Sequence, residues 1–156
     1  MITLIDNALL DEVCAEAAAS PRRRKNRNLH PTDDHPAHRL LNAMQPDSYI
    51  PPHRHLDPNK DETFVVLRGL LGLVTFDDVG NVVQSVKVGA GGTAMGLDIP
   101  HGTWHTAVAL EPDTVFLEAK AGPYLPFSDA ERAPWAPAEN TAEAAPYLAV
   151  LKAGMP

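Results

Sequence analysis

The chain has 156 residues but a single cysteine, Cys14, so it has no partner for an internal disulfide. It also lacks the CxxC or Cys/His spacing of a structural zinc site. No apolar run approaches the roughly 18 residues of a membrane span, and no basic leader opens the sequence. These absences predict a cytoplasmic protein without disulfides, transmembrane anchor or export signal.

Positive charge is scarce as well. Lysine and arginine number 13 against 20 acidic residues, for a formal net charge of -7. This balance argues against general affinity for nucleic acid or for an anionic membrane surface. Hydrophobic residues make up 44% and charged residues 21%, as in globular rather than disordered proteins. One domain with its own core is therefore expected.

The chain divides into three segments of that single domain. Residues 1–37 hold a short helix, which Asp6 can cap and Pro21 ends, and an irregular crossing rich in arginine. Residues 38–122 hold about eight short apolar runs separated by Gly and Pro turns, a pattern typical of an all-β sandwich or barrel. The runs are HRLLNAMQ, SYIPPHRH, ETFVVLRG, LLGLVTF, VVQSVKV, TAMGLDI, WHTAVAL and TVFLEAK. Residues 123–156, rich in Pro and Ala, are expected to wrap back onto the barrel.

Four ligand-type residues lie in this strand-rich segment. Successive side chains on a strand point to opposite faces, so His53 and His55 project both imidazoles to one side. Glu62 has the parity of Phe64 on the next run, which brings a carboxylate toward the same interior. His105 opens a later run. The pattern predicts that three imidazoles and one carboxylate converge.

A divalent cation is the physical reason to gather such residues. A buried, unpaired carboxylate costs several kcal/mol, and neutral imidazoles do not compensate its charge. Three imidazoles and one carboxylate suit Fe, Mn, Zn, Ni or Co, with one or two positions left for water or substrate. Asp61, directly before Glu62, is the alternative carboxylate.

Two spaced motifs resemble the cupin pattern. His53-x-His55, Glu62 and Gly69 resemble the first cupin motif, and PHGTWH, which ends at His105, resembles the second. Over residues 20–125 the chain is similar to the WbuC-type cupin-fold metalloproteins, small bacterial proteins associated with O-antigen and polysaccharide clusters. The resemblance implies a double-stranded β-helix, or jelly roll, with the two histidines of the first motif, Glu62 and His105 as metal ligands.

The sequence departs from the general cupin pattern at several positions. Asp47 and Ala94 stand where a glycine is usual, and Ala109 replaces an asparagine after the last ligand. The spacer between His55 and Glu62 is also longer than usual. These changes leave the ligands intact, but a substrate known for other cupins does not carry over.

Further residues are candidates for substrate contact or proton transfer. Ala107 and Ala109 are small and follow His105 at the same parity, which predicts a hollow for a substrate. Candidate bases are His101 and Glu118. Tyr49 shares the parity of His53 and is a candidate to supply a phenol to the cavity, with structural packing as its alternative role. Candidates for binding an anionic substrate group are the basic residues Arg22, Arg23, Arg24 and Arg27.

The functional hypothesis is a metal-dependent isomerase or epimerase acting on a sugar or sugar phosphate in O-antigen or polysaccharide metabolism. The alternatives are an iron-dependent dioxygenase-like enzyme and a non-catalytic, metal-dependent sugar-binding module. A homodimer is expected, because sheet edges need protection and two-fold dimers are the commonest assemblies.

Overall fold

The computed structural model describes residues 2–156 and contains two α-helices, one 3-10 helix and eight strands. Their bounds are α1 (Asn7–Ala19), β1 (Arg24–Asn28), β2 (Ala37–Met44), β3 (Glu62–Arg68), β4 (Leu70–Phe76), β5 (Val82–Gly89), β6 (Gly96–Ile99), β7 (Trp104–Ala109), β8 (Thr114–Ala121), η1 (Asp129–Glu131) and α2 (Ala144–Ala153). Within this range no helix is both long and apolar enough to cross a membrane.

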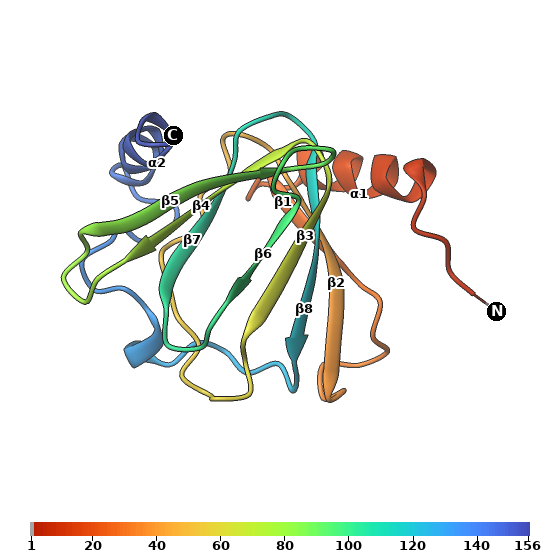
Figure 1. The fold of residues 1–156 in the computed structure, drawn as a ribbon, viewed down its shortest axis with the longest axis horizontal. Helices are drawn as coiled ribbons and strands as arrows, with labels where there is room; N and C mark the ends of the chain where they lie inside the picture. The colour runs from red at the N-terminus through yellow and green to blue at the C-terminus, as the bar shows by residue number, and fades with distance from the viewer. Residues whose placement is uncertain (1) are drawn as a thin grey trace.

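The strands form two antiparallel sheets that pack face to face (Figure 1). One sheet has five strands in the order β1-β2-β8-β3-β6, and the other has three in the order β5-β4-β7. Apolar side chains from both sheets fill the space between them, among them Met44, Phe64, Val66, Leu71, Leu73, Val88, Ile99, Ala107, Ala109 and Phe116. The predicted all-β jelly roll is confirmed.

A helix covers the outer face of each sheet, and the two helices lie on opposite sides of the molecule (Figure 1). The side chain of Asp6 accepts a hydrogen bond from the Leu9 amide and caps α1, as predicted. Buried residues of α1 pack on the five-stranded sheet in a cluster of Leu10, Val13, Cys14, Ala17, Leu41, Ala43 and Val115. Leu148 and Leu151 of α2 pack on the three-stranded sheet. Both faces of each sheet are therefore partly shielded from solvent.

The strand register sets which side chains enter the space between the sheets. On β3, Glu62 and Phe64 are buried while Thr63 between them is exposed. Glu62 lies opposite Lys120 of β8, and Phe64 lies opposite Glu118. Polar residues are thus placed at one end of an otherwise apolar interior.

Two sequence-based expectations about local structure are wrong. The arginine-rich crossing is not irregular, because residues 24–28 pair with β2, from Arg24 opposite Met44 to Asn28 opposite Leu40. SYIPPHRH, expected as a strand, makes only isolated bridges at His53. Two consecutive prolines in this run lack the N–H groups that a continuous ladder requires.

The C-terminal segment packs back onto the barrel. The ring of Trp135 lies 4.9 Å from that of Phe76 and 6.2 Å from that of Trp104, measured between centroids. Val150 of α2, in contrast, is 68% exposed. The boundaries at residues 37 and 122 remain predictions.

Candidate metal centre

The histidine loop, residues 52–55, is held from both sides. The backbones of His53 and His105 exchange two hydrogen bonds, of 3.0 and 2.9 Å. On the other side, the Arg54 amide donates to the carbonyl of Glu131 at 3.0 Å. Because β7 fixes one edge of the loop and η1 the other, the directions of the loop's side chains are set by backbone contacts.

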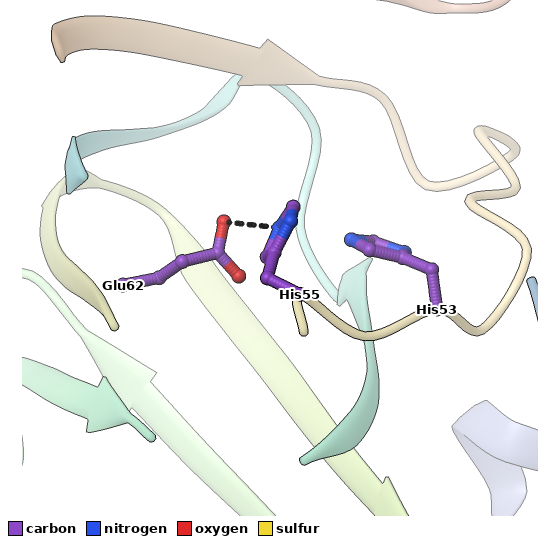
Figure 2. A group of neighbouring side chains, drawn as sticks. All are labelled: His53, His55 and Glu62. Atoms are coloured by element: carbon purple, nitrogen blue, oxygen red, sulfur yellow. Dashed lines mark ion pairs between the residues drawn. The ribbon is translucent and has the colours of Figure 1, made fainter. Parts of the chain in front are cut away.

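His53, His55 and Glu62 each offer one ligand atom, and these atoms all lie within 4.8 Å of one another. Figure 2 shows the carboxylate of Glu62 facing the ring of His55, with His53 beyond it. Nε2 of His55 is 3.2 Å from Oε1 of Glu62. His105 completes the cluster, since its Nε2 is 2.9 Å from Oε2 of Glu62 and its ring centroid is 4.6 Å from that of His53. The structure therefore places all four residues expected to bind the metal in one cluster, although His105 is not part of the group whose ligand atoms all lie within 4.8 Å of one another.

Backbone carbonyls orient two of the imidazoles. Nδ1 of His53 is 3.0 Å from the carbonyl oxygen of Pro51, and Nδ1 of His105 is 2.9 Å from that of Thr103. A carbonyl accepts only from a protonated nitrogen, so in the neutral rings Nε2 carries the free lone pair. Burial, reinforced by the neighbouring His105, lowers the pKa of His53 to about 3. His53 is thus neutral near pH 7, the state in which histidine binds metals.

The carboxylate of Glu62 has an unsatisfied oxygen. Burial raises its pKa, but the surrounding groups, among them the charged Lys120, outweigh burial and hold the pKa well below its usual range. Among the described residues, Oε2 has no hydrogen-bond partner, although Nε2 of His105 is only 2.9 Å away. A buried anionic oxygen facing a nitrogen lone pair lacks a cation. The donor set therefore fits a divalent transition metal.

A network that the sequence analysis missed borders this cluster. Nζ of Lys120 lies 2.8 Å from Oε1 of Glu62 and 2.8 Å from Oε1 of Glu118. It is also 3.4 Å from Nε2 of His55. Asn42 donates to the other oxygen of Glu118 at 2.8 Å. In TVFLEAK, Lys120 has the same parity as Glu118, so strand periodicity was a signal that could have identified it.

These carboxylates raise the pKa of Lys120, although burial alone would lower it. Burial raises the pKa of Glu118 more strongly than the Lys120 ammonium lowers it. The lysine charge therefore screens two buried carboxylates that would otherwise repel each other.

A cavity of about 300 Å³ opens beside the cluster. Its polar wall includes Asn42, Glu118 and Lys120 together with the metal-ligand candidates His53, Glu62 and His105. Its apolar lining consists of Met44, Ile50, Phe64, Ala107 and Phe116. Ala107 lines this space, as its small size suggested, whereas Ala109 is packed in the core.

Three other candidates lie outside this cavity. His101 has a side chain 44% exposed, and its Nδ1 is 2.8 Å from Oδ1 of Asp61. Asp61, the alternative carboxylate ligand, therefore contacts His101 rather than the imidazole cluster. Tyr49 donates through its hydroxyl to the Pro137 carbonyl at 2.8 Å and packs against the edge of Tyr147.

The four arginine candidates separate into two groups. Arg22 and Arg24 line the cavity and form ion pairs with Glu139. Arg23 pairs with Asp47, and Arg27 pairs with acidic residues of α1. Only the first two are therefore placed to reach a ligand in the cavity.

Comparison with solved structures identifies the fold. The structure of KdgF from Halomonas sp. matches with a TM-score of 0.51 and 19% identity, over 66% of this chain and 82% of that chain. A cupin superfamily protein from Desulfitobacterium hafniense matches with a TM-score of 0.52 and 12% identity, over 70% and 86% of the two chains. An oxalate oxidase structure matches with a TM-score of 0.50 and 18% identity, over 67% and 53%. Together with the two-sheet architecture, these likenesses establish a cupin fold.

Comparison at the sequence level gives the family. The chain has no significant match among curated proteins. Residues 5–88 match a family model described as a domain of unknown function, DUF6016. This stretch covers more than half of the chain, from α1 through β5, and includes His53, His55 and Glu62. The protein therefore belongs to the DUF6016 family and has the cupin fold.

Proposed function

We propose that this protein is a metal-binding cupin that holds one divalent transition metal through His53, His55, Glu62 and His105 and binds a sugar-like, anionic small molecule beside it. The observation that carries the proposal is the unpaired, buried Oε2 of Glu62, which faces Nε2 of His105 at 2.9 Å. A cation between them satisfies both atoms. The choice among Fe, Mn, Zn, Ni and Co is left to measurement, because geometry and availability select metals as much as affinity does.

The cavity supports a small polar ligand. Its volume of about 300 Å³ is at the lower end of the range for small-molecule sites. Asn42, Glu118 and Lys120 offer donors and acceptors suited to hydroxyl groups. Two guanidinium groups in the same lining, those of Arg22 and Arg24, share a single carboxylate and favour a negative group. The apolar part of the lining suits the carbon skeleton of a sugar.

Isomerase or epimerase chemistry is the reaction class we favour. A bound divalent metal would polarise a carbonyl or hydroxyl of the substrate. Such a reaction also needs a group that moves a proton, and Glu118 lies in the cavity wall, whereas His101 is at the exposed surface beside Asp61. In this proposal Lys120 holds Glu118 in position and Asn42 fixes its second oxygen.

The biological setting follows from the WbuC-type resemblance alone. It supports a role in bacterial O-antigen or polysaccharide metabolism. The proposed cytoplasmic location rests on the single cysteine, and the proposed homodimer on the need to protect sheet edges. The alternative is iron-dependent oxygen chemistry, which the fold shared with an oxalate oxidase supports. Oxygen uptake with iron but not with zinc would favour that alternative over isomerisation. A metal-loaded protein that binds sugars without turnover would be a binding module.

Elemental analysis of untagged protein tests the proposal. We expect about one transition metal per chain in the wild type and loss of the metal in His105→Ala and Glu62→Ala. Asp61→Ala is the matched control, because it removes the adjacent carboxylate, which contacts only His101. The proposal fails if the wild type holds no metal after incubation with Fe(II), Mn(II), Ni(II), Co(II) and Zn(II), or if Glu62→Ala retains it.

A further inference from the structure

Two arginines of the N-terminal segment bind one carboxylate of the C-terminal segment. Nε and Nη2 of Arg22 donate to the two oxygens of Glu139, each at 3.0 Å. Nη1 and Nη2 of Arg24 donate to the same two oxygens at 2.8 and 3.1 Å. Both guanidinium groups are thus bidentate on a single carboxylate, the geometry with which arginine recognises carboxylate and phosphate ligands.

The position of Arg24 is fixed independently of Glu139. Its side chain is only 13% exposed, and Nη1 also donates to the Tyr49 carbonyl at 3.0 Å. Arg24 lies on β1, which is anchored along its length to β2. Glu139, in contrast, lies on the irregular segment between η1 and α2. The arginine is therefore the preformed half of the pair.

A second cavity, of about 290 Å³, lies where these groups meet. Its charged lining consists of Arg22, Arg24, Arg132 and Glu139, three guanidinium groups against one carboxylate. Among the described residues, Arg132 makes no ion pair and donates instead to the Phe127 carbonyl. The lining is therefore net positive even with Glu139 in place.

The second cavity adjoins the candidate metal centre. His53 lines both cavities, as do Arg22 and Arg24. A ligand whose one end occupies the space beside the metal ligands can therefore place its other end among the arginines. The remaining lining of the second cavity is apolar, formed by Ile50, Pro51, Pro52, Phe127, Ala133, Ala136, Pro137 and Ala138.

We infer that this second cavity is an anion site for a carboxylate or phosphate group of the ligand, and that Glu139 is an internal carboxylate that occupies the arginines until such a group displaces it. The inference rests on the proposed function only for the other end of the ligand. An internal carboxylate competes with an external anion at high effective concentration. For example, if Glu139 occupied the arginines for nine-tenths of the time, an external anion would bind about ten-fold more weakly. Displacement of Glu139 also releases the C-terminal segment from β1.

Titration with inorganic phosphate by calorimetry, at constant ionic strength, tests the site. We expect Glu139→Gln to bind phosphate at least about ten-fold more tightly than the wild type. Glu143→Gln is the matched control, because it removes an equal charge from the same segment and Glu143 makes no ion pair within residues 2–156. The double variant Arg24→Gln/Glu139→Gln is expected to lose the gain.

Equal phosphate affinity in the wild type and Glu139→Gln, or a gain that survives loss of Arg24, would overturn the inference. The comparison is repeated in the His105→Ala background, which lacks a proposed metal ligand. A gain that persists there supports an anion site distinct from the metal centre. If the gain in phosphate affinity disappears in the His105→Ala background, phosphate binds at the metal rather than in the second cavity. That result contradicts this inference and leaves the proposed function intact.

Proteolysis of the wild type provides a second measurement that does not depend on a variant folding. Glutamyl endopeptidase cleaves after Glu139 only when that residue leaves the arginines. We expect phosphate to accelerate this cleavage relative to chloride. Unchanged or slower cleavage would show that the pair is a permanent link between the two ends of the chain.

Discussion

Nε2 of His105 lies 2.9 Å from Oε2 of Glu62, while Nδ1 of the same ring lies 2.9 Å from the carbonyl oxygen of Thr103. The Thr103 carbonyl selects the tautomer that is protonated on Nδ1, so in the neutral ring Nε2 has no proton to donate to Glu62. Two lone pairs then face each other in a buried site. A cation bound between these two atoms would stabilise both lone pairs, which strand packing alone does not do.

Added metal is expected to raise the melting temperature. A ligand that binds only the native state stabilises it by about 2.7 kcal/mol at 100 times its dissociation constant, which corresponds to about 5–10 °C for a domain of this size. In Glu62→Gln this shift should disappear, because the amide contributes no charge. Differential scanning calorimetry with and without Zn(II) or Mn(II) measures both, with Asp61→Asn as the control. An equal shift in wild type and Glu62→Gln would place the metal elsewhere.

Much of the site was predictable because it depends on local periodicity. The alternation of Glu62 and Phe64 directs both side chains inward whatever strand lies beside them. Capping of α1 by Asp6 likewise depends on residues within one turn. The convergence of His53 with His105 was expected from two facing strands, but His53 lies in a loop that reaches His105 of β7 through an isolated bridge.

Other features depend on long-range pairing and could not be predicted locally. Lys120 matters because the register of β8 places it opposite Glu62, 58 residues away. Arg24 and Glu139 are 115 residues apart, and no local pattern connects them. The same holds for β1, whose arginines and asparagines favour exposure and become a strand only because β2 offers a free edge.

Gly69→Ala tests the turn between β3 and β4. Gly69 and Gly91 both have φ of +74°, but a Cβ at Gly69 would lie 2.6 Å from Oγ1 and 3.0 Å from Cα of Thr114. At Gly91 nothing lies within 4 Å. We expect Gly91→Ala to cost about 1 kcal/mol from backbone strain and Gly69→Ala at least about 2 kcal/mol, because it adds a steric clash. Urea denaturation compares the two, and equal losses would mean that the clash relaxes freely.

Glu131→Gln tests the support of the histidine loop. The backbone N–H groups of Leu56 and Ser128 donate to the Glu131 carboxylate and hold its pKa at about 2. A folded-state pKa below the unfolded value near 4.5 contributes stability above that value and loses it as pH falls through 2. We therefore expect Glu131→Gln to cost about 1 kcal/mol near pH 6, as for other lost capping contacts, and progressively less as pH falls from about 4.5 towards 2.

Urea midpoints for wild type and Glu131→Gln, measured across this pH range, show whether the two stabilities converge as pH falls. Asp129→Asn is the control, since it removes a charge from the same short helix, η1, and the Asp129 side chain has no hydrogen-bond partner in the described chain. A constant difference between wild type and Glu131→Gln at all pH values would show that the amide fails for steric reasons.

Lys120→Met should be destabilising in a way that metal relieves. The side chain of Lys120 is 18% exposed and is paired with two carboxylates, Glu62 and Glu118, each at 2.8 Å. Its removal leaves two buried negative charges without a counterion, an effect that costs about 3–5 kcal/mol for buried pairs. A divalent cation bound to Glu62 replaces part of the lost charge, so the cost measured by urea denaturation should be smaller with saturating Zn(II) than with a chelator.

The double variant Lys120→Met/Glu118→Gln, which removes one carboxylate as well, should recover part of the lost stability in the presence of the chelator. An equal cost under both metal conditions would show that the lysine stabilises the barrel by packing rather than by its charge at the metal centre.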